Sequence, residues 1–263
     1  MAVNLQKFLP GYYLLRINSD FKKGESLKAL KLPLKILDVT VRGKKMIFIL
    51  ENDTYIVASF GMTGHFTWTE STNKKVWFEL SANGKDVSGE LYYEDVRKLG
   101  SFSLYKSKES LKNSFINTVG PDFLEDVLPR PDFINSKITF EKWLAVVKKV
   151  KKSVCDFLLD QKYFSGIGNI YRSEIAYYSK INPKRSMSSL SGEELKTLYS
   201  NCVFIMTKAF KERGSLNYPN PQGEKGIYEP VVYGKDYDSL GNKVLQDKCG
   251  TQRTIHYVAS IQK

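Results

Sequence analysis

The feature that most constrains this chain is a Gly-x-Gly turn between two helical segments, within residues 158–174. This stretch has the sequence LLDQKYFSGIGNIYRSE, and its second helix is predicted to begin at Asn169. Gly166 and Gly168 can adopt positive φ and have no Cβ atoms, so backbone N–H groups and the Asn169 side chain can approach an oxyanion closely. A DNA or RNA phosphate fits such a turn, although a plain helical corner or a nucleotide loop has a similar pattern.

The composition indicates a globular protein with a polyanionic partner. The 263 residues suffice for one large or two moderate domains, and 42% of them are hydrophobic. Forty Lys and Arg against 28 Asp and Glu give a net charge of +12, which favours nucleic acid or an anionic membrane surface as partner. No run approaches the roughly 18 apolar residues of a membrane span, and the start lacks a signal-peptide pattern, so we predict an intracellular protein.

The first half of the chain has the pattern of antiparallel β structure. Short runs of β-branched or aromatic residues recur at Val39–Val41, Met46–Leu50, Thr54–Phe60, Val76–Leu80, Glu90–Tyr93 and Ser101–Tyr105. Turn residues separate them at Asn52-Asp53 and Asn83-Gly84. The sequence therefore predicts an N-terminal β-sandwich over residues 1–120.

The pattern changes after residues 121–136, which contain three prolines and are predicted to be a linker. Apolar residues then recur with helical spacing from Phe140 to Val154. Ser191-Gly192-Glu193-Glu194 is a capping box, which predicts a helix over Leu195–Phe210. We therefore predict a helical domain over residues 137–215.

The C-terminal part combines a loop with further β structure. Residues 216–227 are rich in Pro, Gly and charge, which predicts a mobile loop. Residues 228–263 contain β-rich runs at Val231–Tyr233, Leu240–Leu245 and Thr254–Val258. Two of these strands, joined around Asp247–Gly250, would form a hairpin with Arg253 near its turn. The predicted fold class is α+β.

Cysteine and histidine are scarce. Cys155, Cys202 and Cys249 are too few and too scattered to predict a disulfide framework or a four-ligand zinc site. His65 and His256 are the two histidines. We expect neither a structural metal nor a cofactor.

Extended beyond the glycines, the central stretch becomes specific. Leu159-Asp160-Gln161 followed by Gly166–Tyr171 and Glu174 resembles the helix–two-turns–helix motif of the formamidopyrimidine-DNA glycosylase/endonuclease VIII family. The resemblance implies that Gly168 and Asn169 bind a DNA phosphate. It also implies that Glu174 lines the damaged-base pocket, where it is a candidate catalytic residue.

A lysine at a strand entry is a second point of resemblance. Gly43-Lys44-Lys45 precedes the apolar run Met46–Leu50 and is similar to the position where the family keeps a lysine. Alignment of that run selects Lys44, with Lys45 as the competing choice and a solvated strand end as the structural alternative. Lys44 is therefore a candidate both for DNA binding and for catalysis.

Two loops are similar to the family segments that fill the gap left by an everted base. Gly61–Gly64 offers Met62, and Asp95–Gly100 offers Arg97 and Leu99, where the family often has an aromatic wedge. A flipped nucleotide leaves an unstacked gap, and long apolar or guanidinium side chains recover part of the stacking. The alternative is that Met62 and Leu99 belong to the core of the sandwich.

The C-terminal hairpin resembles the DNA-binding finger of the family in its metal-free form. Family zinc fingers place four cysteines around this hairpin, whereas Val258 and Ile261 follow Tyr257 here. The hairpin is therefore expected to be held by apolar packing. Arg253 matches the finger arginine that contacts phosphates flanking the lesion; a free surface arginine is the alternative.

The first residues depart from the family pattern. Family enzymes begin with a proline, whose amine is the nucleophile, followed by a glutamate, but residues 1–11 resemble only the end of that first helix. Expelling a base from a sugar needs an unprotonated amine and a carboxyl group that manages protons. Either the recorded start of an active enzyme is incomplete, which we favour, or the protein has lost the nucleophile and only binds damaged DNA.

The resemblance implies a base excision repair glycosylase that is also a β-elimination lyase. Its partner would be duplex DNA containing oxidised bases or abasic sites, and residues 216–227 would form the lesion-pocket loop. We expect a monomer without a membrane partner, located in the nucleus or cytoplasm, or in the nucleoid of a prokaryote. A general basic nucleic-acid or ribosome-associated binder is the alternative, and it would bind lesion and intact duplex alike.

Overall fold

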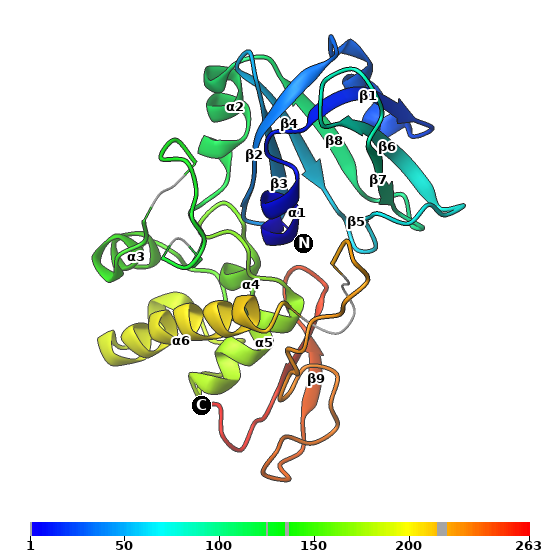
Figure 1. The fold of residues 1–263 in the computed structure, drawn as a ribbon. Helices are drawn as coiled ribbons and strands as arrows, with labels where there is room; N and C mark the ends of the chain where they lie inside the picture. The colour runs from blue at the N-terminus through cyan, green and yellow to red at the C-terminus, as the bar shows by residue number, and fades with distance from the viewer. Residues whose placement is uncertain (1, 125, 135–136, 215–219) are drawn as a thin grey trace. The chain divides into compact units, whose positions relative to one another are not determined.

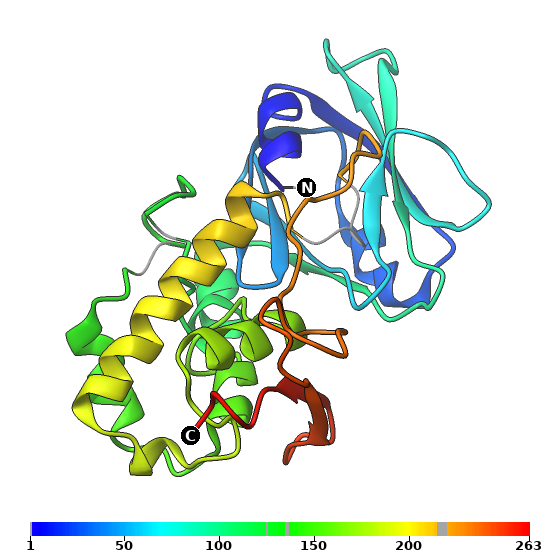
Figure 2. The same ribbon diagram turned by 90° about the horizontal axis from the view of Figure 1, so that it is seen from below.

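The computed structural model describes residues 2–124, 126–134, 137–214 and 220–263 (Figures 1 and 2). The chain forms two compact units, Met1–Thr118 with Leu216–Gly226 and Val119–Ser215 with Ile227–Lys263. The described part of the predicted linker belongs to the second unit, because Phe123, Leu128 and Ile134 are buried there.

The first unit is built on eight antiparallel strands. In chain order they are β1 (Tyr13–Ser19), β2 (Leu34–Arg42), β3 (Lys45–Leu50), β4 (Thr54–Ser59), β5 (His65–Thr67), β6 (Lys74–Ser81), β7 (Gly89–Glu94) and β8 (Ser101–Tyr105). They pair in the order β5-β7-β6-β1-β2-β3-β4-β8. Helices α1 (Ala2–Phe8) and α2 (Lys108–Ser114) and the short 3-10 turns η1 (Lys22–Ala29) and η2 (Ile116–Thr118) complete the unit.

Aromatic side chains from both halves of this sheet meet in one core. The Phe48 ring on β3 lies 5.5 Å from the Phe78 ring on β6, and Phe78 lies 6.3 Å from Phe102 on β8. The sheet therefore folds over, and its two halves enclose the core as the predicted sandwich does. All six predicted strands are present; β1 and β5 were not predicted.

The turn between β3 and β4 follows from its sequence. Asn52 and Asp53 both adopt left-handed backbone conformations, with φ of 57° and 53°. Two such residues give the turn that matches the twist of an antiparallel hairpin, and Asn and Asp tolerate this conformation better than most side chains. This turn was predicted correctly.

The second unit contains four helices and a hairpin among its described residues. They are α3 (Phe140–Val147), α4 (Val154–Leu159), α5 (Asn169–Tyr178) and α6 (Gly192–Lys211), the 3-10 turn η3 (Met187–Ser189), and strands β9 (Leu245–Lys248) and β10 (Thr254–Tyr257). The predicted capping box is present at α6, where Ser191 and Glu194 cap each other's backbone N–H groups. The helical period predicted from Phe140 to Val154 is interrupted after Val147, and α4 restarts with Ser153 as its cap.

The hairpin has shorter strands than predicted. Strands β9 and β10 pair antiparallel: Leu245 lies opposite Tyr257, and Lys248 lies opposite Thr254. The turn therefore covers residues 249–253. Residues 231–233 and 240–244 are outside the strands, because their backbone N–H groups bond to side chains or turns.

Cys155 and Cys249 form a disulfide, which the cysteine count did not predict. The bond joins α4 to the end of β9 across 94 positions of sequence. The prediction failed because a pair so distant in sequence becomes adjacent only through the packing of the hairpin on α4. Cys202 remains free and buried.

Among the described residues, no helix combines the length and apolar character needed to cross a membrane.

Candidate functional site

Three of the candidate DNA-contacting positions gather at one end of the first unit's sheet. The strand register places Lys45 opposite Ser59, and Ser59 opposite Ser101. The turn with Lys44 precedes Lys45, the loop with Met62 follows β4, and Leu99 lies just before β8. The antiparallel register of β3, β4 and β8 therefore brings all three segments to the same end of the sheet (Figure 1).

A buried carboxylate fastens the two loops to each other. Asp95 accepts a hydrogen bond from Thr63 Oγ1 at 2.5 Å and another from the Gly100 amide at 2.7 Å. The Arg97 amide donates to Thr63 Oγ1 at 3.2 Å. Burial alone raises the pKa of Asp95, but these hydrogen bonds to its charged form outweigh burial and hold the pKa below its usual value. Asp95 therefore acts as an ionised clamp.

Gly61 lets the loops approach closely. Its φ is +60°, and a Cβ built on it would lie 2.6 Å from the Cβ of Leu99. No other residue type fits both this conformation and this contact without displacing Leu99.

The three gap-filling candidates point into solvent. Met62 is 56% exposed and Leu99 45% exposed, and Arg97 is exposed as well. Arg97 Nη1 lies 3.3 Å from the sulfur of Met62, so the two side chains are in contact. Neither Met62 nor Leu99 belongs to the core, which removes the structural alternative for both.

The two competing lysines differ in their surroundings. The ammonium of Lys45 lies 5.1 Å from the centroid of the Phe115 ring, a cation–π contact within the unit. Lys44 is exposed in the turn between β2 and β3. Lys44 is the more exposed of the two lysines and stays the candidate for DNA contact.

In the second unit, the Gly-x-Gly turn is organised by a glutamine. Gln161 donates to the Leu159 and Ile167 carbonyls, at 2.8 and 3.0 Å, and accepts from the Gly166 amide at 2.9 Å. Gly166 adopts positive φ, at +99°, whereas Gly168 is extended with φ −114°. Gly168 is instead the N-terminal cap of α5, a position that needs extended backbone.

Helix α5 begins at Asn169, as predicted, and its first turn has no side-chain cap among the described residues. By contrast α3, α4 and α6 are each capped by a Ser or Thr hydroxyl. Uncapped N–H groups at a helix start carry partial positive charge and bind anions. The start of α5 therefore has the donors that a phosphate needs.

The Asn169 side chain is held by the finger. Its Nδ2 donates to the Thr254 carbonyl at 3.0 Å and lies 3.4 Å from the Tyr233 hydroxyl. Its Oδ1 is buried and has no hydrogen-bond partner among the described residues. Asn169 thus links the start of α5 to the hairpin.

A buried arginine that the sequence analysis missed supports the turn with Arg253. Arg172 Nη2 donates to the carbonyls of Arg253 and Thr254, at 2.9 and 3.1 Å, and Nη1 donates to the Cys155 carbonyl at 3.3 Å. Burial lowers the pKa of Arg172 to about 10, so it stays charged at neutral pH. The Arg253 side chain itself is exposed. A basic residue on an amphipathic helix is usually solvent-facing, which is why the pattern gave no signal.

Glu174 is completely buried and binds backbone. Its carboxylate accepts from the amides of Val231, Val232 and Tyr233, at 2.7, 2.9 and 3.0 Å. Burial raises the pKa of Glu174, and the three hydrogen bonds oppose this rise. The contacts position the segment that leads into the finger; a role in a base pocket stays a prediction.

Apolar packing and one aspartate hold the finger, where family zinc fingers have cysteines. Val232, Val244 and Val258 form a small core against which Ile261 packs. Asp238 accepts hydrogen bonds from the Tyr177 hydroxyl at 2.9 Å and from the Asn242 amide at 2.8 Å. The predicted apolar packing is present; Asp238 was not predicted.

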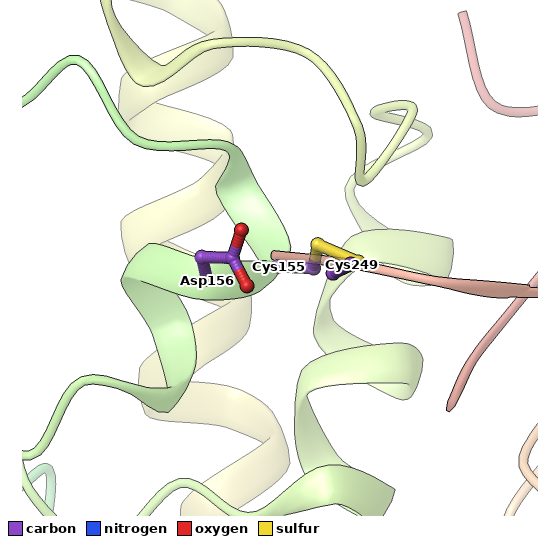
Figure 3. A group of neighbouring side chains, drawn as sticks. All are labelled: Cys155, Asp156 and Cys249. Atoms are coloured by element: carbon purple, nitrogen blue, oxygen red, sulfur yellow. A yellow bond between two sulfur atoms is a disulfide. The ribbon is translucent and has the colours of Figure 1, made fainter. Parts of the chain in front are cut away.

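The disulfide lies beside Asp156, on α4 (Figure 3). Among the described residues, Cys155, Asp156 and Cys249 are the one group of three potential metal ligands, with donor atoms within 4.8 Å of one another. The two sulfurs are bonded to each other, so the group as it stands offers no thiolate. The expectation that the finger needs no metal stays a prediction.

Comparisons with known proteins agree with this geometry. Residues 16–102 match the formamidopyrimidine-DNA glycosylase N-terminal domain, and residues 130–219 match the formamidopyrimidine-DNA glycosylase H2TH domain. The formamidopyrimidine-DNA glycosylase of Listeria monocytogenes is 32% identical over 205 residues, covering 76% of this chain and 71% of the relative. That of Bacillus cereus is 30% identical over 228 residues, covering 84% and 74%.

Solved structures show the same fold. The Lactococcus lactis Fpg in complex with abasic-site DNA has a TM-score of 0.85 at 23% identity, covering 100% of this chain and 96% of that one. The MutM (Fpg) protein of Thermus thermophilus has a TM-score of 0.85 at 24% identity, covering 99% and 95%. Together with the two matched domains and the curated relatives, they lead to one conclusion: the chain belongs to the formamidopyrimidine-DNA glycosylase family.

Proposed function

We propose that this protein is a base excision repair DNA glycosylase with abasic-site lyase activity, acting on oxidised bases in duplex DNA. The observation that carries the proposal is the set of exposed side chains Met62, Arg97 and Leu99. The Asp95 clamp holds them together at one end of the sheet. Exposed apolar side chains that are gathered on two loops braced against each other are typical of an interaction surface.

The gap in a DNA helix from which a base has been everted suits these three side chains. Everting a nucleotide costs a few kcal/mol of stacking, and inserted side chains recover part of it. Met62 and Leu99 supply apolar surface, and the planar guanidinium of Arg97 can stack or bond to the orphaned base. This recovery favours DNA in which a base is damaged or missing, because such a base is easier to evert.

The second unit supplies contacts for the DNA backbone. The uncapped start of α5 and the exposed Arg253 are both typical of phosphate binding. The net charge of +12 adds long-range attraction to DNA. The Lactococcus lactis relatives bound to abasic-site or oxidised-pyrimidine DNA support the same class of partner.

Abasic-site cleavage requires an amine that attacks the sugar C1′. The amine lone pair forms the C–N bond, water leaves to give an imine, and loss of a C2′ proton then expels the 3′ phosphate. Lysine amines can form such imines, and Lys44, exposed in the turn beside the gap-filling loops, is a candidate amine for this step.

Borohydride trapping on an abasic-site duplex tests this directly, since it reduces the imine to a stable covalent adduct. We expect trapping by this chain, less by Lys44→Ala, and no loss in the matched Lys45→Ala variant. Undiminished trapping by Lys44→Ala would contradict the assignment of Lys44.

The same proposal places the protein inside the cell, in the compartment that holds its DNA, whether nucleoid, nucleus or cytoplasm. We propose that it acts as a monomer, because both sets of DNA-contacting residues come from one chain.

A further inference from the structure

The Cys155–Cys249 disulfide lies at the base of the turn that carries Arg253. Cys155 is in the first turn of α4, and Cys249 follows β9 directly (Figure 3). The Cys249 carbonyl accepts from the Gln252 amide at 2.8 Å, which closes the turn just before Arg253. The position of this turn is therefore tied covalently to α4.

Non-covalent contacts also hold this turn, both from α4 and from α5. Asp156 accepts from the Gly250 amide at 3.1 Å and from the Thr251 amide at 3.2 Å. Arg172 on α5 donates to the Arg253 carbonyl at 2.9 Å. Each residue of the turn except Gln252 is thus bound directly to α4 or α5.

The hairpin depends on these contacts. Its two strands have four residues each, and two-stranded hairpins are marginally stable in water without outside packing. The cluster that packs it on α4 consists of both disulfide cysteines with Ile255, Tyr257 and Leu245. Cys155 is the α4 residue of that cluster, so breaking the disulfide removes the covalent bond between α4 and the hairpin.

We propose that Cys155 and Cys249 form a reversible thiol–disulfide site whose oxidised state fixes the Arg253 turn for phosphate binding. The inference rests on the proposed function, because it assigns Arg253 to the DNA backbone. Oxidation proceeds when one cysteine thiolate attacks a small disulfide and releases one thiol. The second thiolate then displaces the other thiol, so that the small disulfide accepts the two electrons. A dithiol or phosphine reductant reverses the process.

Burial limits access to the two sulfur atoms. Cys155 is 1% exposed and Cys249 8% exposed, so exchange requires local opening of the hairpin. A pocket of about 350 Å³, lined by Asp156, Gly250 and Thr251 among others, lies beside the turn. Disulfides in intracellular proteins are rare and are usually redox-active, which agrees with a reversible role.

The chemical state is tested by counting reactive thiols in the denatured chain. After mild oxidation we expect one thiol, from Cys202, and after reduction three. Cys155→Ser and Cys249→Ser should each show two thiols under both conditions, and the control Cys202→Ala none after oxidation. Three thiols in the oxidised wild-type protein would overturn the proposal.

The consequence is tested on the full chain by hydrogen exchange and by DNA affinity. A chelator is kept in all buffers, because reduced Cys155 and Cys249 with Asp156 have the geometry to capture a soft metal. Reduction is expected to speed exchange of the amides of residues 246–255. If the turn is then ordered only part of the time, affinity for an abasic-site duplex falls by about three- to tenfold, and reoxidation restores it.

Cys155→Ser should behave as the reduced protein in both redox states, and Cys202→Ala should respond to reduction as the wild type does. Unchanged exchange on reduction would overturn the proposal. Faster exchange with unchanged affinity would overturn the link to DNA binding. Faster exchange in a protein that binds no DNA in either state would support the anchoring role and show that the proposed function had failed.

Discussion

Asp95 makes two separate loops into one binding element. Its carboxylate is buried and joins the loop of Met62 to the loop of Leu99 through Thr63 and Gly100. The side chains expected to touch DNA are exposed, and the residue that orients them is not.

Asp95→Asn should destabilise the protein by about 2–3 kcal/mol, because an amide cannot accept all the hydrogen bonds that the carboxylate accepts. Urea unfolding at neutral pH measures the loss, with Asp86→Asn on an exposed turn as the matched control. An Asp95→Asn protein as stable as the control would contradict the clamp.

The same residue gives a pH dependence. The pKa of Asp95 is depressed in the folded state, so its stabilisation is present above the unfolded value and is lost as the pH falls through the folded one. The stability difference between wild type and Asp95→Asn should therefore be constant at neutral pH and shrink below about pH 4. Unfolding curves collected from pH 7 downward measure it, and a difference that grows in acid would show the sign to be wrong.

Asn169→Ala is expected to weaken binding of lesion and intact duplex alike, by about 1–3 kcal/mol, as for a hydrogen bond to a charged group. The loss should be equal for both because phosphates carry no lesion information. Fluorescence anisotropy with both duplexes measures it. The control is Asn201→Ala, which removes an amide bonded to Ser179 at the opposite end of α5 from Asn169. Unchanged affinity for both duplexes would refute the assignment.

At the residue scale, local motif spacing singles out Met62, Arg97, Asn169 and Arg253, and their roles in DNA binding stay predictions. Met62, Arg97 and Arg253 are exposed, whereas Asn169 is half-buried. Arg172 was missed because its partners are carbonyls 81 and 82 positions away. No local pattern encodes such contacts.

At the scale of elements, the loops at the end of the sheet formed by β3, β4 and β8 should determine lesion preference. Met62→Ala removes apolar surface from the gap-filling set, and it should lower the ratio of abasic-site to intact-duplex affinity by about tenfold. Binding of intact duplex should change little. Leu37→Ala, which truncates a similarly exposed side chain on β2, is the control. An equal loss for both duplexes would mean that Met62 contacts the backbone instead.

Predicting elements succeeded where the signal was periodic and failed where it was not. The strands with alternating or β-branched runs and the capped helix α6 were all found. Strand β5 has three residues, too few for a periodic pattern to be recognised. The segment 231–233 resembles a strand but is bound by the Glu174 carboxylate instead. Tertiary hydrogen bonding overrode local β propensity there.

At the scale of the whole molecule, the finger should be independent of metal. Apolar packing around Val232, Val244 and Val258, the Asp238 contacts and the disulfide already hold it. Treatment of the oxidised protein with a strong chelator should leave both the Tm and the affinity for DNA unaltered. Release of stoichiometric zinc with loss of binding would contradict this account.

Recognition of damaged duplex DNA is tested by equilibrium binding of an abasic-site duplex and an intact duplex, compared at equal salt over a series of salt concentrations. A general basic binder has the same affinity and the same salt dependence for an abasic-site duplex as for the intact duplex of the same sequence. We expect tighter binding of the abasic-site duplex, with a similar salt slope for both, because the phosphate contacts are shared and the gap-filling contacts are not. Equal affinities for the two duplexes would contradict it.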